Sequence, residues 1–196
     1  MVGCAGQVWG AASILRVLGS DAFIVDASVL ESVARLHEPS GAFAAELRAV
    51  GFDLDRPEMR YAPATLLAVL DVCAKHRYPE LSREDAHRQI GRKFVDHFFA
   101  TFLGRVAGTL VQALGVKRFL LKVPKVASMI TKGLEVDSQQ VTPNEIRMVF
   151  RGSPDMSADY TTGTIEGAAK AGKFEIQAEI VRREPEEFEV RITGIR

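Results

Sequence analysis

The residue types that most often do chemistry in proteins are few in this chain, and they are not grouped. The four histidines are His37, His76, His87 and His97. His87 and His97 are ten residues apart on one predicted helix, and a rotation of about 100° per residue turns them to different faces. A helical metal site needs ligands about one turn apart. The histidines are therefore interpreted as exposed or hydrogen-bonded structural residues, and no metal or other cofactor is predicted.

Two pairs of carboxylates could do acid–base chemistry. Asp53 and Asp55 lie in an irregular stretch, and Glu84 and Asp85 lie at the start of a predicted helix. Acidic residues are expected at both kinds of position, because they form turns and complement the helix dipole. The sequence contains no GxSxG elbow, P-loop or GxGxxG fingerprint. No catalytic residue is assigned, and the prediction leans towards a protein that is not an enzyme.

An aromatic ladder is the candidate ligand-binding surface. Phe94, Phe98 and Phe102 recur every four residues, so they share one face of a helix. Residues at this spacing are first of all core residues, but small-molecule pockets are also lined mainly by apolar and aromatic side chains. Cys73 lies in another apolar helical pattern, which is typical of a buried, inert thiol. The predicted ligand-binding residues are Phe94, Phe98, Phe102 and Cys73.

A basic segment is the candidate docking surface for a partner. The chain is neutral overall, with 25 basic and 25 acidic side chains, so no global field favours nucleic acid or an anionic membrane. Between Arg92 and Lys132, however, eight basic residues are opposed by one acidic residue, and the stretch from Glu135 onward is acidic. This predicts a basic side for an acidic protein partner or an anionic group; the alternative is a set of solvated surface side chains. The predicted contacts are Lys117, Arg118, Lys122 and Lys125.

Length and composition favour one domain. The chain has 196 residues, of which 47% are hydrophobic, enough to bury a sizeable core. We expect a single domain from residue 20 to 196, preceded by an extension from Met1 to Gly19. The extension holds the only Trp within an apolar run, which suggests a homodimer interface. Two cysteines without a CxxC spacing, no signal peptide and no long apolar stretch predict a cytoplasmic protein without a membrane span.

The central element is a predicted helix from Ser82 to Leu114, whose apolar residues recur at helical spacing. Ser82 and Asp85 form a capping-box pattern at its start, and Gly115 is placed to end it. The segment Lys117 to Val123 is predicted to be a strand or an extended link. Pro124 then begins another short helix that runs towards Gly133.

The C-terminal third predicts strands. Apolar and polar residues alternate from Phe174 to Ile180 and from Phe188 to Ile192, and the stretch from Gln139 to Phe150 predicts a half-buried strand. Between them, residues 157–171 predict a crossover helix in which Gly163 and Gly167 offer a flat face to a sheet. The predicted class is α+β: a mainly helical N-terminal part with a long central helix, packed on a small C-terminal antiparallel sheet.

Three stretches resemble a known family. They are FAAELRAVGFDLDRP from Phe43, RYPELSREDAHRQIGRKFVDHFFATFLGR from Arg77, and the helix ADYTTGTIEGAAKAG followed by a terminal β pair. The chain from Phe23 to its end resembles a paralogous family of uncharacterised proteins expanded in myxobacteria, domain of unknown function 2378. This family has no assigned activity, so the resemblance bears on fold more than on function.

The order of elements is also similar to a ligand-binding fold shared by haem nitric-oxide sensors, vinyl-reductase-type domains and vesicle-tethering subunits. That resemblance implies a cavity between helices and sheet, which holds haem in some relatives and an acyl chain in others. The haem branch carries an axial histidine before the β hairpin and a Tyr-x-Ser-x-Arg signature. Neither is found in Val126 to Lys132 or in Met148 to Met156, so haem is disfavoured.

The sequence therefore predicts a non-catalytic regulatory or scaffolding module that binds a small apolar ligand, a protein partner, or both. The alternative is an enzyme of unrecognised type that uses a pocket between the central helix and the sheet. A closed, fully packed interior would exclude both small-molecule functions and leave a module for protein interaction.

Overall fold

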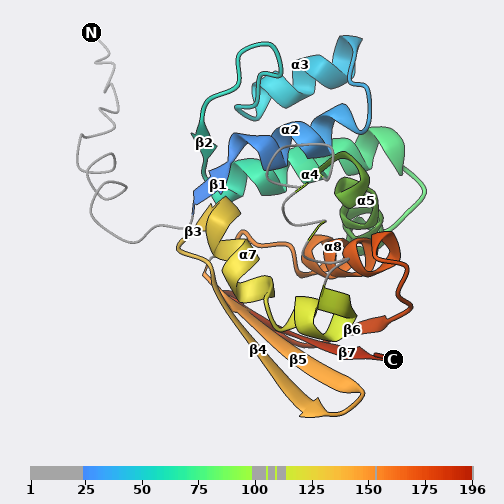
Figure 1. Cartoon of the computed structure of the whole chain (residues 1–196). Helices are drawn as coiled ribbons and strands as arrows, with labels where there is room; N and C mark the ends of the chain where they lie inside the picture. The colour runs from blue at the N-terminus through green and yellow to red at the C-terminus, as the bar shows by residue number, and fades with distance from the viewer. Residues whose placement is uncertain (1–23, 99–104, 106–108, 110–113, 153, 196) are drawn as a thin grey trace, which may run out of the picture.

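The fold is layered: two helices of the C-terminal half lie on the main sheet, and the N-terminal helices stack on the far side of them (Figure 1). The structure is a computed structural model that describes residues 24–98, 105, 109, 114–152 and 154–195. The predicted α+β class is confirmed. The homodimer prediction for Met1 to Gly19 concerns residues outside the described part. No helix in the described ranges combines the length and hydropathy that a membrane span requires.

Three of the helices begin at a side-chain cap that the sequence supplies. The Asp26 carboxylate accepts the Ser28 backbone N–H at 2.9 Å. The predicted capping box is present: the Asp85 N–H donates to Ser82 Oγ at 3.1 Å, and the Ser82 hydroxyl donates to the Asp85 carboxylate at 2.9 Å. The helices are α2 (Ala27–Arg35), α3 (Gly41–Ala49), α4 (Pro63–Arg77), α5 (Arg83–Phe98), α7 (Val123–Ile130) and α8 (Ala158–Ala171).

The central helix is described as α5 up to Phe98, and most of its predicted continuation lies outside the described residues. The prediction of a strand or extended link from Lys117 to Val123 is wrong, because residues 114–120 are helical. Val116, Phe119 and Leu120 are all buried there. Their spacing of three and four residues is typical of a helix that buries one face.

The main sheet has the strand order β4-β5-β7-β6, and its pairs are antiparallel. Phe150 pairs with Phe188 and their rings stack at 4.8 Å, on the buried face towards the helices. Helix α8 crosses over from β5 to β6, as predicted, so β7 lies between them. The strands are β4 (Glu135–Thr142), β5 (Glu145–Arg151), β6 (Gln177–Arg183) and β7 (Glu187–Thr193).

Two parts of the β structure differ from the prediction. The single strand expected from Gln139 to Phe150 is a hairpin of β4 and β5, which turns at residues 143–144, a Pro-Asn pair. A second sheet, in the order β2-β1-β3, joins β1 (Ile24–Asp26), β2 (Arg60–Tyr61) and β3 (Thr131–Lys132). Two of its strands have two residues each, too few for an alternation to register in the sequence.

Glycines set the distance between α5 and α8. A Cβ atom on Gly163 would lie 2.0 Å from the Arg88 carbonyl oxygen, and one on Gly91 would lie 2.1 Å from the Tyr160 carbonyl oxygen. The two backbones therefore touch directly. The prediction that Gly163 and Gly167 face a sheet is wrong: both meet α5, because only glycine permits this close helix crossing.

Candidate functional site

A cavity of about 180 Å³ lies among the helices and the sheet. Helix α5 contributes Phe94 and Val95, and α8 contributes a longer wall that runs to Ala168. The wall is mostly apolar, as in sites for small organic molecules. The lining residues, besides those discussed below, are Val25, Val29, Pro63, Leu66, Phe119, Val123, Ala127, Leu134, Phe150, Met156, Thr161 and Ile165.

The predicted ligand-binding residues separate in the structure. Phe94 lines the cavity and is 3% exposed. Phe98 ends α5, but its side chain, like all of Phe102, lies outside the described part. Cys73 is fully buried and free, and burial raises the pKa of its thiol to about 12. Cys73 is not among the described residues that line the cavity. The structure therefore places this predicted ligand-binding residue in the core.

Tyr160 is the unusual residue of the cavity wall. It lines the cavity, is 8% exposed, and packs edge-to-face on Phe94 with ring centroids 5.7 Å apart. Its hydroxyl oxygen is buried and has no hydrogen-bond partner among the described residues. Burial raises the pKa of this hydroxyl, and the Thr164 side chain lowers it by less, so the hydroxyl stays protonated. Because the oxygen has almost no accessible surface, this donor is packed behind the surface of the cavity, and the sequence analysis did not identify it.

Two of the other hydroxyls on the wall have backbone partners. Thr131 Oγ1 donates to the Ala127 carbonyl at 2.8 Å, and Thr164 Oγ1 donates to the Tyr160 carbonyl at 2.9 Å. Asp155 is the single charged residue among the described lining residues, and it is half-buried. The polar capacity of this wall is therefore small.

A relay of polar side chains begins at the cavity wall and runs to the surface. Ser157 Oγ lies 2.9 Å from His87 Nδ1, and His87 Nε2 lies 3.0 Å from the Asp71 carboxylate. Asp71 also accepts a hydrogen bond from Arg83 at 2.6 Å. Burial lowers the pKa of His87 in spite of the nearby Asp71, so the ring is neutral at neutral pH. His87 Nε2–H then donates a hydrogen bond to Asp71, and Nδ1 accepts one from the Ser157 hydroxyl.

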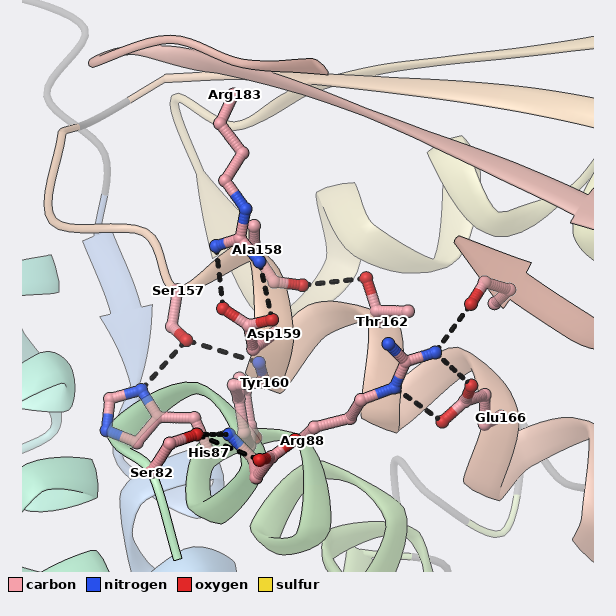
Figure 2. A network of polar contacts seen from close by, with 12 residues as sticks. Ser82, His87, Arg88, Ser157, Ala158, Asp159, Tyr160, Thr162, Glu166 and Arg183 are labelled. Carbon is pink, nitrogen blue, oxygen red and sulfur yellow. Dashed lines mark hydrogen bonds and ion pairs between the residues drawn. The ribbon is translucent and has the colours of Figure 1, made fainter. Parts of the chain in front are cut away.

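Charged side chains fix α8 between α5 and the sheet (Figure 2). Glu166 accepts hydrogen bonds from Arg88 and Arg92 of α5, the latter at 2.7 Å. Burial opposes ionisation of Glu166, but these bonds outweigh it and lower the carboxyl pKa. At the start of α8, Asp159 forms a two-bond ion pair with Arg183 of β6, both bonds at 2.7 Å. The network supports the wall of the cavity that α8 forms.

The histidines do not line the described part of the cavity wall. His37 is buried, and burial together with Lys93 and Arg77 lowers its pKa to about 4. His76 stacks on Phe43 at 4.6 Å. No histidine is found among the described lining residues, and the described part of the chain holds no cluster of His, Cys, Asp or Glu that could bind a metal.

The predicted docking residues lie together on the segment around the start of α7. Arg118, Lys122 and Lys125 are exposed, and Lys117 is half-buried. The neighbouring Phe119 and Val123 form part of the cavity wall instead. One short segment thus carries cavity residues and basic surface residues.

The comparisons with known proteins concern family and fold. The family model described as "Protein of unknown function (DUF2378)" matches residues 24–193. No curated protein matches the sequence.

Among solved structures, H-NOX domains are similar in fold. A point mutant of the T. tengcongensis H-NOX aligns with a TM-score of 0.63 at 22% identity, covering 84% of this chain and 94% of that one. An oxygen-binding H-NOX domain related to soluble guanylate cyclases gives 0.61 at 20% identity, covering 85% and 90%. A structure described by haem redox potential and porphyrin distortion gives 0.64 at 19% identity, covering 85% and 96%. At these identities the similarity concerns the fold alone.

Proposed function

The chain belongs to the DUF2378 family, and we propose that its domain is a non-catalytic regulatory module that binds a small apolar molecule in the cavity beside α5 and α8. The observation that carries this proposal is the cavity of about 180 Å³ with its mostly apolar wall. Protein interiors are normally close-packed, so a hollow lined by apolar side chains is a place where a bound molecule would gain packing contacts and remove apolar surface from water. Oxygen binding by a neighbour of the same fold is consistent with this use.

The size of the cavity bounds its ligand. Engineered apolar cavities of about 150 Å³ bind benzene or xenon. Sites for drug-sized molecules have roughly 300–1,000 Å³. The proposed ligand is therefore a compact molecule with about the bulk of one aromatic ring.

The described residues do not fit haem, which the similar fold would imply. A porphyrin is larger than the drug-sized molecules that already need more volume than this cavity has. The protein ligands of haem iron are His, Cys, Met or Tyr. The described wall contains Met156 and Tyr160 but neither His nor Cys, so it lacks the histidine that accompanies a methionine ligand of haem iron, and its volume is too small for a porphyrin.

The alternative function is an enzyme that uses the same cavity. The Ser157–His87–Asp71 relay is the observation in its favour, because it has the order of a serine nucleophile, a base and an orienting carboxylate. However, Ser157 is also the N-cap of α8, and its oxygen accepts the Tyr160 N–H at 3.2 Å. His87 is only 1% exposed. A hydroxyl fixed by a helix cap is a poor nucleophile, so we assign the relay a structural role.

A regulatory role also needs a partner, and the basic segment is the proposed contact. Changing Lys117 and Arg118 to glutamate should reduce recovery of a partner in a pull-down from cell extract, because opposite charges steer association. The loss should be larger at low than at moderate salt, since salt screens surface charges. Lys170→Glu, an exposed lysine on α8, is the control for a change of charge alone. Equal recovery with the parent and the double variant at both salts would remove this surface from the proposal.

Benzene is a direct probe of the proposed function. We expect saturable binding in an NMR titration, with shifts at residues that line the cavity. Ala168 lines the cavity and is 7% exposed, so leucine at this position adds three carbon atoms to the hollow. Ala168→Leu should therefore weaken benzene binding by at least tenfold.

A further inference from the structure

We propose that the turn between α2 and α3, residues 36–40, is an acid-sensitive latch: when the buried His37 ring takes up a proton, the turn separates from α4 and α5. This inference is independent of the proposed function, because it involves no bound molecule and His37 is not part of the described cavity wall. It adds a conformational response of the N-terminal helices to pH.

The His37 ring is enclosed, but its hydrogen bonding is incomplete. The residue is 6% exposed, and its ring packs edge-to-face on Tyr78 with centroids 5.7 Å apart. The Nε2 atom is buried and has no hydrogen-bond partner among the described residues. In a protonated ring both nitrogens carry a hydrogen, so the Nε2–H donor would lack an acceptor there. The closed turn therefore accommodates the neutral ring and not the charged one.

The charged groups that act most on this ring are all cationic. Arg77 of α4, together with Lys93 and His97 of α5, opposes a positive charge on His37. Glu38, the acid next to it in the chain, is exposed. Burial first, and then these cations, lowers the pKa of His37 to about 4. A proton on the ring would create a buried charge with no counter-charge, which is costly.

One of these cations also holds the turn in place. The Arg77 guanidinium donates hydrogen bonds to the carbonyl oxygens of His37 and Glu38, the latter at 3.4 Å. It also lies 5.7 Å from the centre of the Phe43 ring on α3. Glu38 has a φ of 46°, a left-handed conformation that costs free energy in a residue other than glycine. Charging His37 repels the group that attaches the turn, and opening relieves the strain at Glu38.

The direction of the pH dependence follows from the linkage between opening and proton uptake. An exposed histidine has a pKa of about 6.5, so the open turn takes up a proton at a higher pH than the closed turn does. The stability of the closed turn is therefore complete above pH 6.5, and it is lost as the pH falls from there to about 4. Between pH 8 and pH 5 we expect the equilibrium constant for opening to rise by about tenfold or more.

Amide hydrogen exchange of the full chain, measured by NMR at pH 8 and pH 5 and corrected for the intrinsic pH dependence of exchange, tests this inference. The N–H groups of His37 and Glu38 donate to the carbonyls of Ala34 and Arg35, at 3.0 and 3.2 Å. Their protection should fall by about tenfold or more at pH 5, whereas amides in the middle of α8 keep theirs.

Two variants assign the response to His37. His37→Phe keeps an aromatic ring that cannot take up a proton, so protection of the turn should be the same at both pH values. Lys93→Met removes one opposing cation and should make the fall smaller. Lys170→Met, at an exposed position on α8, is the control for the loss of a positive charge and should leave the fall unchanged.

The other outcomes would overturn the latch. No fall in the parent, or an equal fall in the turn and in α8, would mean that acid does not open the turn selectively. An equal fall in His37→Phe would assign the response to another group. If that variant does not fold, the NMR shift of the His37 ring protons in the parent decides: titration well below pH 6 supports the latch, and titration near pH 6.5 overturns it.

Discussion

Replacing Gly163 with alanine is expected to lower the free energy of unfolding by about 3 kcal/mol or more, the upper end of the range for overpacking. The new Cβ would lie 2.0 Å from the Arg88 carbonyl oxygen, a backbone atom that cannot move aside on its own. Alanine is the better helix former by about 1 kcal/mol, but this gain is smaller than the cost of separating α5 from α8. Urea unfolding followed by circular dichroism measures the difference.

Lys170→Ala is the matched control on the same helix, because Lys170 is exposed, and it should stay within about 0.5 kcal/mol of the parent. Gly91→Ala should reproduce the large loss from the opposite side of the contact, since its Cβ would lie 2.1 Å from the Tyr160 carbonyl oxygen. A Gly163 variant as stable as the parent would mean that the two backbones do not touch. Helices α5 and α8 both contribute to the cavity wall, so a true separation would change the cavity as well.

Replacing Tyr160 with phenylalanine is expected to stabilise the ligand-free protein by about 1 kcal/mol or more. The hydroxyl is buried without a partner, and an unsatisfied buried polar group costs about 1–3 kcal/mol. Phenylalanine keeps the ring and its contact with Phe94 while it removes the oxygen. For a chain of this length, 1 kcal/mol corresponds to about 2–4 °C in Tm. A thermal melt of protein freed of ligand checks this result.

Tyr61 supplies the contrasting case. It is buried to a similar degree, but its hydroxyl accepts the Glu58 N–H at 2.7 Å. Tyr61→Phe leaves that donor without its partner and should destabilise the protein by about 1 kcal/mol. Opposite signs for the two substitutions are the expected pattern. If both variants lost stability equally, the Tyr160 hydroxyl would have a partner in the folded protein.

The sequence predicted those elements of the fold that depend on a local pattern. Alternation alone located the two terminal strands, and Ser82 with Asp85 located the start of α5. The sequence did not predict which element packs against the glycines of α8. The spacing of Gly163 and Gly167 suits close contact with a sheet or with a helix equally well. Strands of two residues, such as β2 and β3, are also too short to produce a periodic pattern in the sequence.

The candidate site was only partly predictable for a related reason. Phe94 belongs to the buried core and lines the cavity at the same time, so its helical spacing could not distinguish packing from a hollow. Cys73 has the same kind of pattern, yet it lies in the core outside the described cavity wall. Tyr160 lies in the predicted crossover helix, and only the structure reveals that its hydroxyl is buried without a hydrogen-bond partner. A void and an unsatisfied atom are properties of three-dimensional packing, which local sequence does not specify.

The titration of the parent protein and Ala168→Leu with benzene tests the central claim most directly, because it measures occupation of the cavity itself. The account predicts saturable shifts at lining residues such as Phe94 and Ile165, and at least a tenfold weaker affinity when leucine fills the space beside them. Absence of saturable shifts in the parent, or equal binding by a folded Ala168→Leu variant, would contradict it.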